Sequence, residues 1–445
     1  MMRLLVLVLL SLGWTGSAFG QPLSGVWHGR LEAGSTDLRM ELELLAQDEG
    51  LQASLISLDQ GGARIPASAA ELDGTRLRLT FNSIAARYEA EVMQTRLSGI
   101  FVQGGEEFDL EFVRGRFDGE HAHGAVMDRP GDDVFVDGAV RLAGTLLRPD
   151  TPGAAPGVVL LNGSGSQDRD STVAGQPGFA LLAEALAAEG IVTIRMDDRG
   201  VGQSDPVPPD SPSDLARDAA HALTFLRGQP GVDPACTGFV GHSEGALIAF
   251  LAAGQHSDPA FIVSLAGMTG RLQDILVEQG EALNRAMGAT EQQIEANRVM
   301  QEAVFAAIEN AAPGEADQEI ERTMLANGVA AQVAAEQARI WGQTYVVEHF
   351  KLEPRAAFAR YEGPVLAYYA EHDLQILPGP NRRRLEAARE GLPTRIEILP
   401  GLNHLFQESE TGLPAEYATR GHAMAPTARE TISQGVAAWA RQACG

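Results

Sequence analysis

The sequence is poor in positive charge compared with negative charge. Its 445 residues include 34 lysines and arginines against 59 aspartates and glutamates, which gives a formal net charge of −25. A field of that sign repels phosphate backbones and anionic lipids. The charge therefore argues against nucleic-acid and membrane-surface partners, and a solvated acidic surface is the simplest interpretation.

Long apolar runs are also lacking beyond the first residues of the chain. Arg3 precedes an almost wholly apolar stretch over 4–12, and the small residues Ala18 and Gly20 follow. This layout is typical of a secretory signal peptide over residues 1–20, cleaved after Gly20. The stretch is short for a membrane span, and no cysteine near the cleavage point suggests a lipid anchor. We expect a soluble, exported protein that is periplasmic or extracellular.

Cysteine is scarce, with only Cys236 and Cys444 in the whole chain. An even pair in an oxidising compartment favours a disulfide. Two unpaired thiols, one buried and one on a frayed tail, are the alternative.

Two patterns of apolar and polar residues divide the chain. Residues 21–127 hold short runs of alternating apolar and polar residues, separated by turn signals such as "DQGG" and "LDG". This pattern predicts an antiparallel all-β domain. From residue 133, apolar strands alternate with helical patterns, which predicts a mostly parallel sheet covered on both faces. We expect this core to span 133–267 and to resume over 356–445.

The segment between the two parts of the core, 268–355, is rich in Ala, Glu and Gln and shows no strand pattern. Its apolar spacing predicts amphipathic helices. Both flanking segments carry candidate catalytic loops, so we expect the insertion to be a helical cap over a site. A helical decoration that only packs is the alternative.

Residues 239–250, "FVGHSEGALIAF", place Ser243 in a G-x-S-x-G pattern between an apolar strand and a helix. That spacing is typical of a nucleophile elbow, in which flanking glycines allow a sharp turn. A serine hydroxyl needs a base, an acid that orients the base, and donors for the oxyanion. An ordinary turn serine is the alternative.

The predicted base is His404, in the loop "GLNHLF" directly after the last strand. Its rivals are His422 in a later loop, His372 beside the candidate acid, His349 at the end of an insertion helix, and His242 in the elbow. Position after the final strand favours His404.

The predicted acid lies in "YYAEHDLQILP", just past a strand. Asp373 stands at the loop position and Glu371 nearer the strand end. We favour Asp373, although a turn aspartate that caps the next helix would give the same pattern.

Two backbone N–H groups are expected to hold the oxyanion. One is that of Glu244, after the nucleophile. The other is that of Ser164, in the glycine-rich loop "NGSGSQDRD" that follows a buried strand. No G-K-[ST] follows this loop, so it is not a phosphate loop.

Together, "LLNGSGSQDRD", "DDRGVGQS", "GHSEG", "YAEHDLQILP" and "GLNHLF" resemble the motifs of the α/β-hydrolase superfamily, in the family order of nucleophile, acid and base. The resemblance covers about 133–445 and is closest to bacterial esterases of the serine-aminopeptidase-like branch, some of which carry an N-terminal β domain. It implies a doubly wound, mostly parallel sheet with a helical cap insertion, preceded by a small all-β domain. It also implies roles for Ser243, Asp373 and His404 as triad and for Ser164 and Glu244 as oxyanion donors.

One residue departs from the family pattern. The histidine usual before Gly163 is Asn162 here, and we expect it to brace the loop by hydrogen bonds. Asp198 and Arg199 match a family turn motif and are interpreted as structural. The fold that the resemblance implies places Cys236 at the end of the sheet away from the site, and the final helix would bring Cys444 there, so the resemblance favours a Cys236–Cys444 disulfide.

The leading hypothesis is therefore an exported serine hydrolase acting on a small-molecule carboxylic ester, with no metal or organic cofactor. A peptidase or amidase with the same triad is the nearest alternative, and acyl transfer to an alcohol is another. A non-catalytic envelope-binding protein stays open as a different class, although the intact Ser, Asp and His argue against it.

Overall fold

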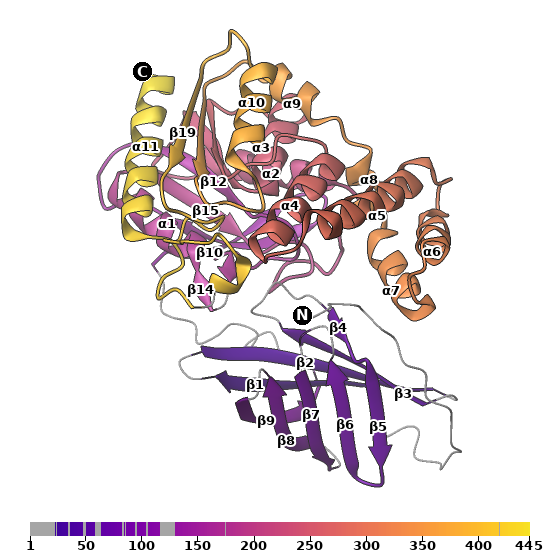
Figure 1. Ribbon diagram of the computed structural model, residues 1–445. Helices are drawn as coiled ribbons and strands as arrows, with labels where there is room; N and C mark the ends of the chain where they lie inside the picture. The colour runs from indigo at the N-terminus through magenta and orange to yellow at the C-terminus, as the bar shows by residue number, and fades with distance from the viewer. Residues whose placement is uncertain are drawn as a thin grey trace. The chain divides into compact units, whose positions relative to one another are not determined.

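The alternating pattern near the N-terminus forms an antiparallel sheet. The computed structural model in Figure 1 describes residues 23, 25–33, 36–47, 50–57, 64–81, 84, 86–93, 96–103, 106–115, 130–173, 175–417 and 419–445, and the predicted signal peptide lies outside these ranges. Within them, this sheet has nine strands in the order β4-β3-β2-β1-β9-β8-β7-β6-β5. The strands are β1 (Gly25–Ala33), β2 (Thr36–Gln47), β3 (Gly50–Ser57), β4 (Arg64–Pro66), β5 (Ala69–Asp73), β6 (Arg76–Phe81), β7 (Ala86–Val92), β8 (Arg96–Gln103) and β9 (Glu106–Arg114).

Alternation along these strands produces a single buried face. Trp27, Leu42, Tyr88, Phe101 and Phe112 are almost wholly buried and belong to one apolar cluster. Strands β3 and β5, near opposite ends of the sheet order, lie close to each other. The sheet is therefore barrel-like, which agrees with the all-β pattern predicted for this part of the sequence.

The second sheet carries the candidate catalytic loops. Among the described residues it has eight strands in the order β10-β11-β15-β12-β16-β17-β18-β19, and the pairs from β15 to β19 are parallel. Strands β10 and β11 add an antiparallel edge. The strands are β10 (Asp132–Asp137), β11 (Arg141–Leu147), β12 (Ala155–Leu161), β15 (Val192–Met196), β16 (Val232–His242), β17 (Phe261–Leu265), β18 (Val365–Ala370) and β19 (Thr394–Leu399), and a separate pair is β13 (Thr172–Val173) with β14 (Gln176–Pro177).

Helices cover both faces of this sheet. One apolar cluster joins the strands to α2, α3, α9 and α10, and a second joins them to α1 and α11. The bounds of these helices are α1 (Gly178–Ala188), α2 (Pro212–Arg227), α3 (Glu244–Gln255), α9 (Pro354–Arg360), α10 (Pro378–Ala388) and α11 (Pro426–Cys444). Strands buried on both sides have no room for polar alternation, which explains their continuous Val, Ile and Leu runs. The predicted fold class is confirmed.

The Ala- and Glu-rich insertion between β17 and β18 is helical. Its helices are α4 (Leu272–Ala286), α5 (Glu291–Asn310), α6 (Ala316–Ala326), α7 (Ala331–Trp341) and α8 (Thr344–Phe350). Helix α5 begins with a capping box, in which the Thr290 side chain accepts from the Gln293 N–H and the Gln293 side chain accepts in return. No helix among the described residues is long and apolar enough to cross a membrane.

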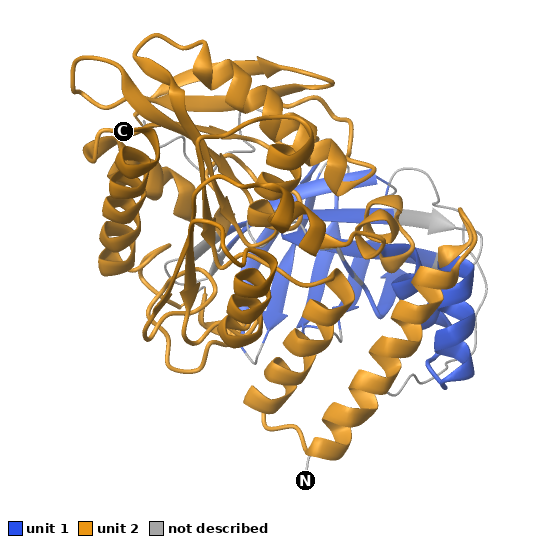
Figure 2. Cartoon of the chain, turned by 90° about the horizontal axis from the view of Figure 1, so that it is seen from above, with its two compact units in different colours: residues 1–58, 63–118, 317–340 blue, residues 59–62, 119–316, 341–445 orange. Residues whose placement is uncertain are grey.

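The chain groups into two compact units (Figure 2). The first comprises residues 1–58, 63–118 and 317–340, and the second comprises 59–62, 119–316 and 341–445. Most of α6 and α7 thus groups with the N-terminal strands, while α4, α5 and α8 group with the parallel sheet. The boundaries expected from the sequence for the β domain, the core and the cap stay a prediction.

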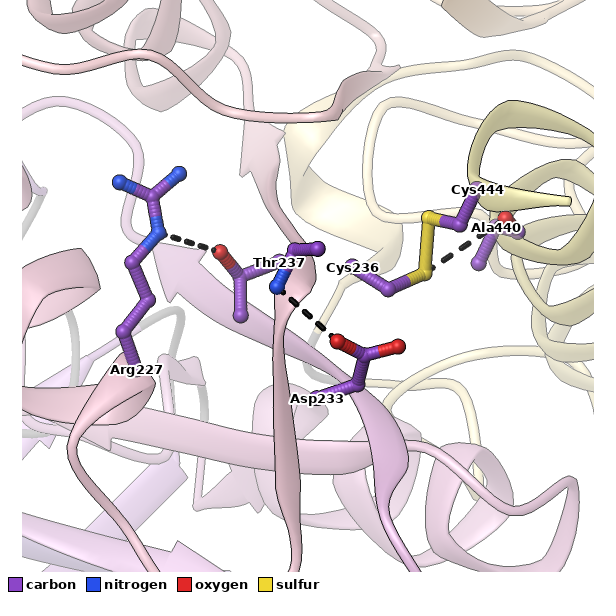
Figure 3. Close-up of a disulfide and its surroundings, with 7 residues drawn as sticks. Arg227, Asp233, Cys236, Thr237, Ala440 and Cys444 are labelled. Carbon is purple, nitrogen blue, oxygen red and sulfur yellow. Dashed lines mark hydrogen bonds between the residues drawn. A yellow bond between two sulfur atoms is a disulfide. The ribbon is translucent and has the colours of Figure 1, made fainter.

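Cys236 and Cys444 are joined by a disulfide between β16 and the last residue of α11 (Figure 3). The two Cα atoms lie 5.5 Å apart, although the residues are 208 positions apart in the chain. The sulfur of Cys236 lies 3.7 Å from the carbonyl oxygen of Ala440. The bridge therefore fastens the C-terminal helix to the central strand, and the structure contains no free cysteine.

Candidate active site

Ser243 stands alone between the end of β16 and the start of α3. Its φ of 55° and ψ of −118° lie in a region that non-glycine residues rarely adopt. The Ser243 N–H donates to the carbonyl of Leu265 at 2.9 Å, which helps to hold this strained conformation. A serine on such a turn presents its hydroxyl at the carboxyl edge of the sheet, as in a nucleophile elbow.

The two glycines of the G-x-S-x-G pattern are required by close packing. A Cβ on Gly245 would lie 2.3 Å from the carbonyl oxygen of Leu161 and 2.4 Å from that of Asn162. A Cβ on Gly241 would lie 2.3 Å from the carbonyl oxygen of Gly245. The first turn of α3 therefore packs directly on the end of β12, where the glycine-rich loop begins.

His404 and Asp373 form a buried pair. Nδ1 of His404 lies 2.7 Å from Oδ2 of Asp373. The other carboxylate oxygen accepts from the N–H groups of Gln375 and Ile376, both at 2.8 Å. Because a carboxylate accepts only, Nδ1 carries the proton, and Nε2 of the neutral ring is left with a lone pair. This is the tautomer that a general base requires.

The other candidates for acid and base have other partners. The half-exposed Glu371 accepts from the N–H of Gly401 at 2.9 Å. Nδ1 of His372 lies 2.6 Å from the carbonyl oxygen of Ser409. His349 contacts Glu244, and among the described residues Nε2 of His422 is buried without a partner. His404 is the histidine that pairs with Asp373.

His242 links the elbow to the candidate base. Its ring centroid lies 4.7 Å from that of His404, and its Nε2 lies 2.9 Å from the carbonyl oxygen of His404. Burial, together with the nearby His404, lowers the pKa of His242 to about 3, so the ring is neutral and Nε2–H donates. Within the described residues no hydrogen bond joins the Ser243 hydroxyl to His404. The structure thus shows His404 oriented by Asp373, and His242, the residue before Ser243, in contact with His404.

The loop after β12 is braced as the Asn162 substitution led us to expect. Nδ2 of Asn162 donates to the carbonyl oxygens of Asp168 and Met196 and to Oδ1 of Asp198, at 3.2–3.4 Å. The other oxygen of Asp198 accepts from the N–H of Gln167 at 2.9 Å. Burial raises the pKa of Asp198 to about 7, and the nearby charge of Glu244 adds to the shift. Asparagine therefore braces this loop.

The same loop meets the elbow. A Cβ on Gly163 would lie 3.3 Å from Cβ of Ser243, so the backbone leading into Ser164 passes next to the serine. The first N–H groups of a helix have no partner within the helix and carry the positive end of its dipole. The N–H of Glu244, the first residue of α3, is such a group. This region is therefore suited to hold an oxygen that gains negative charge.

A small pocket of about 30 Å³ adjoins His242. Its wall includes His242, Leu265, Leu405, Phe406 and Met424. Within the described ranges, no group of three or more His, Cys, Asp or Glu side chains could hold a metal ion.

One feature of the site was missed by reasoning from the sequence, namely the side chain of Glu244. The Tyr345 hydroxyl donates to its carboxylate at 2.6 Å, and Nδ1 of His349 lies 3.0 Å away. The available signal was an acidic residue directly after the candidate nucleophile, but nothing in the sequence pairs its carboxylate with Tyr345 or His349.

Comparison with known proteins supports a single family. The family model described as "Serine aminopeptidase, S33" matches residues 177–410, just over half of the chain. The chain is 24% identical over 292 residues to Esterase EstD of Thermotoga maritima, covering 65% of this chain and 63% of that protein. The chain thus spans less than two thirds of the length of this relative.

Two of the solved structures to which this chain is similar align along most of their own length. One is the α/β hydrolase GrgF from a Penicillium species, with a TM-score of 0.45 and 15% identity, covering 71% of this chain and 99% of that one. The other is Est1E from Butyrivibrio proteoclasticus, with a TM-score of 0.41 and 13% identity, covering 70% of this chain and 98% of that one.

Proposed function

This chain belongs to the serine aminopeptidase S33 family of the α/β-hydrolase superfamily, and on that premise we propose that it is an exported serine hydrolase that cleaves carboxylic esters. The observation that carries the proposal is the buried His404–Asp373 pair, 2.7 Å between Nδ1 and Oδ2, next to the strained elbow of Ser243. In the neutral ring, such a pair places the proton on Nδ1 and leaves the lone pair of Nε2 free to accept a serine proton.

The proposed mechanism has two halves. Oγ of Ser243 attacks the ester carbonyl carbon while Nε2 of His404 takes the hydroxyl proton. The N–H groups of Ser164 and Glu244 hold the oxyanion, and Asp373 stabilises the imidazolium. Collapse breaks the carbon–oxygen bond to the alcohol, which leaves with the proton from His404. Water then attacks the acyl carbon while His404 takes its proton. Breakage of the bond between the acyl carbon and Oγ releases the acid, and His404 returns the proton to Oγ of Ser243.

Ester substrates are favoured by a specific relative, since the similar protein of Thermotoga maritima is named an esterase. A peptidase or amidase acting through the same residues is the second candidate, because the matching family is described by its aminopeptidases. The two differ in the leaving group that His404 must protonate, which is an alcohol in one case and an amine in the other.

The decisive experiment compares two substrate series on the mature protein. We expect p-nitrophenyl esters, from acetate to decanoate, to be hydrolysed, and aminoacyl p-nitroanilides to be cleaved slowly or not at all. Ser243→Ala should remove the activity and the labelling by a fluorophosphonate probe. Ser213→Ala, a serine-to-alanine change in the first turn of α2, serves as the control and should keep both.

Three results would revise the proposal. Faster turnover of the anilides would move the assignment to a peptidase. Equal ester hydrolysis by the wild type and by a folded Ser243→Ala would exclude this nucleophile. Failure of the wild type to turn over either series or to bind the probe would favour the non-catalytic hypothesis.

Export is proposed from the sequence of residues 1–20, with the Cys236–Cys444 disulfide as support, since disulfides persist in oxidising compartments. Expression of the full chain in a bacterium should yield a periplasmic or secreted product that begins at Gln21. Intact-mass measurement checks this, and a cytoplasmic product that retains the first twenty residues would contradict it.

A further inference from the structure

The carboxylate of Glu244 is unusually buried for a charged group. The residue is 3% exposed. The Tyr345 hydroxyl donates to Oε1 at 2.6 Å, and Nδ1 of His349 lies 3.0 Å from the same oxygen. Because a carboxylate accepts only, both partners donate to it. A buried charge survives only where such partners replace water.

The balance of these effects leaves Glu244 ionised. Burial alone raises the pKa of a carboxyl, but hydrogen bonds and charge from His349, followed by hydrogen bonds from Tyr345 and Ser164, outweigh burial and bring the pKa of Glu244 below its ordinary value. Burial and the neighbouring Glu244 raise the pKa of Tyr345, so its hydroxyl keeps the proton that it donates.

This carboxylate joins two segments that lie far apart in the sequence, and a third segment passes close to it. Glu244 follows Ser243 and begins α3. Tyr345 and His349 come from α8, about one hundred residues further along the chain. Ser164 comes from the loop after β12, whose Gly163 backbone passes beside Ser243. One side chain therefore connects the insertion to the elbow, and the Ser164 hydroxyl acts on the same carboxylate by helping to lower its pKa.

Helix α8 is itself firmly held. Phe350 at its end is completely buried, and its ring centroid lies 5.1 Å from that of Phe305 on α5. Helix α8 also contacts α2 and α4. Packing thus fixes the position of α8, and the side chains of Tyr345 and His349 extend from it to Glu244 in the elbow.

Burial of the His349 ring is unfavourable for the stability of the fold. His349 is 4% exposed, and within the described part of the chain its Nε2 has no hydrogen-bond partner. A buried polar atom without a partner destabilises a fold. Its presence indicates that the bond from Nδ1 to Glu244 serves more than packing.

We propose that Glu244 is a positioning residue, whose carboxylate holds the Ser164 loop and helix α8 against the nucleophile elbow and so aligns the two oxyanion donors. The inference rests on the proposed function, because it assigns a role within that same site. Loss of the carboxylate charge should lower kcat and change KM little. The reason is that the two N–H donors would no longer point at the oxyanion. A bond that only stabilises packing would lower Tm without changing kcat.

The first test compares two glutamate variants that make the same chemical change. Glu244→Gln should lower kcat for a p-nitrophenyl ester by roughly 10- to 100-fold, with KM within about threefold, because removal of a whole oxyanion donor costs about 10²–10³. Glu278→Gln is the control, since Glu278 pairs with Arg384 and likewise joins the insertion to the sheet domain. Its kcat should stay within about twofold.

The second test uses Ser164, where side-chain and backbone roles can be separated. Ser164→Ala keeps the backbone N–H but removes the hydroxyl that acts on Glu244. We expect kcat to fall roughly tenfold in Ser164→Ala and clearly less in Ser164→Thr, which keeps a hydroxyl. Tyr345→Phe should lower kcat in the same direction, because it removes one donor to the carboxylate.

The proposal would be overturned if Glu244→Gln lowers Tm but leaves kcat at the wild-type value. Equal kcat for the wild type and Ser164→Ala would also overturn it. If Glu244→Gln does not fold, Ser164→Ala and Tyr345→Phe decide the question by the same criterion. Failure of the proposed function is distinct, because the wild type itself would then neither hydrolyse esters nor be labelled at Ser243.

Discussion

Nδ1 of His404 donates to Oδ2 of Asp373 across 2.7 Å, between loops that follow the last two strands of the parallel sheet. The second oxygen of Asp373 is held by two backbone N–H groups, those of Gln375 and Ile376. The carboxylate therefore cannot turn away from the ring without losing three hydrogen bonds. A carboxylate fixed in this way can hold the His404 ring in one orientation, which is the role proposed for Asp373 in the triad.

Asp373→Asn should lower kcat for ester hydrolysis by roughly 10³- to 10⁴-fold, with little change in KM. The amide can present its NH₂ group to Nδ1, which favours the wrong tautomer of His404 and removes the charge that stabilises the imidazolium. Steady-state kinetics with a p-nitrophenyl ester measures the effect. Glu371→Gln is the control and should stay within about threefold. The reverse ranking would make Glu371 the acid.

Gly245→Ala should lower kcat by about 100-fold and lower Tm as well. The added Cβ would meet the carbonyl oxygens of Leu161 and Asn162 at 2.3–2.4 Å, so the elbow and the Ser164 loop must move apart. Displacement of about 1 Å at an active site costs of the order of 10² in rate. Gly421→Ala, where a Cβ meets open space, should change neither quantity. A fully active Gly245→Ala would show that this contact is not needed.

The candidate site was largely predictable because it follows from strand ends. The loops after parallel strands meet at one edge of a sheet. The positions of Asp373 and His404 after two such strands were therefore enough to predict that they meet. The strained turn of Ser243 followed from its two flanking glycines, and the position of Cys236 in the same strand followed from the implied topology.

The partners of Glu244 could not be predicted for a physical reason. The apolar pattern of a helix shows which face is buried but not which segment covers it. Tyr345 and His349 therefore gave no sign that they reach a residue about one hundred positions earlier. For the same reason, the pattern over 268–355 did not indicate that residues 317–340 group with the N-terminal strands.

Breaking the Cys236–Cys444 disulfide should destabilise the fold but spare the site. It closes a loop of more than two hundred residues, and disulfides typically contribute about 2–4 kcal/mol to the free energy of unfolding. Cys236 precedes His242 by six residues, about 20 Å along an extended strand. Tm should therefore fall on reduction while ester hydrolysis at 25 °C stays within about twofold.

Cys444→Ser provides the matching control for this prediction. Its Tm should equal that of the reduced wild type and should not respond to dithiothreitol. A thiol count on the denatured, oxidised wild type should find none. Two free thiols, or an unchanged Tm on reduction, would contradict the prediction.

Asp198 should make the protein less stable as pH rises from about 4 to about 7. Its pKa is raised by burial to about 7 in the folded protein, whereas an unfolded aspartate titrates near 4. Below pH 4 both states hold the proton, and the residue has no net effect. Between about pH 4 and 7 only the unfolded state releases it, so the free energy of unfolding falls, and above pH 7 it levels off.

Asp198→Asn should flatten the dependence of Tm on pH between 5 and 8, because asparagine does not titrate. Three pH units would give about 4 kcal/mol, but Asp198 keeps some exposed surface, so we expect solvent screening to leave about 1–3 kcal/mol. The slope is the diagnostic quantity, since the amide also alters the bonds to Asn162 and Gln167. Asp150→Asn, at an exposed position, should keep the wild-type slope. An equal slope in Asp198→Asn would show that Asp198 is already ionised at pH 5.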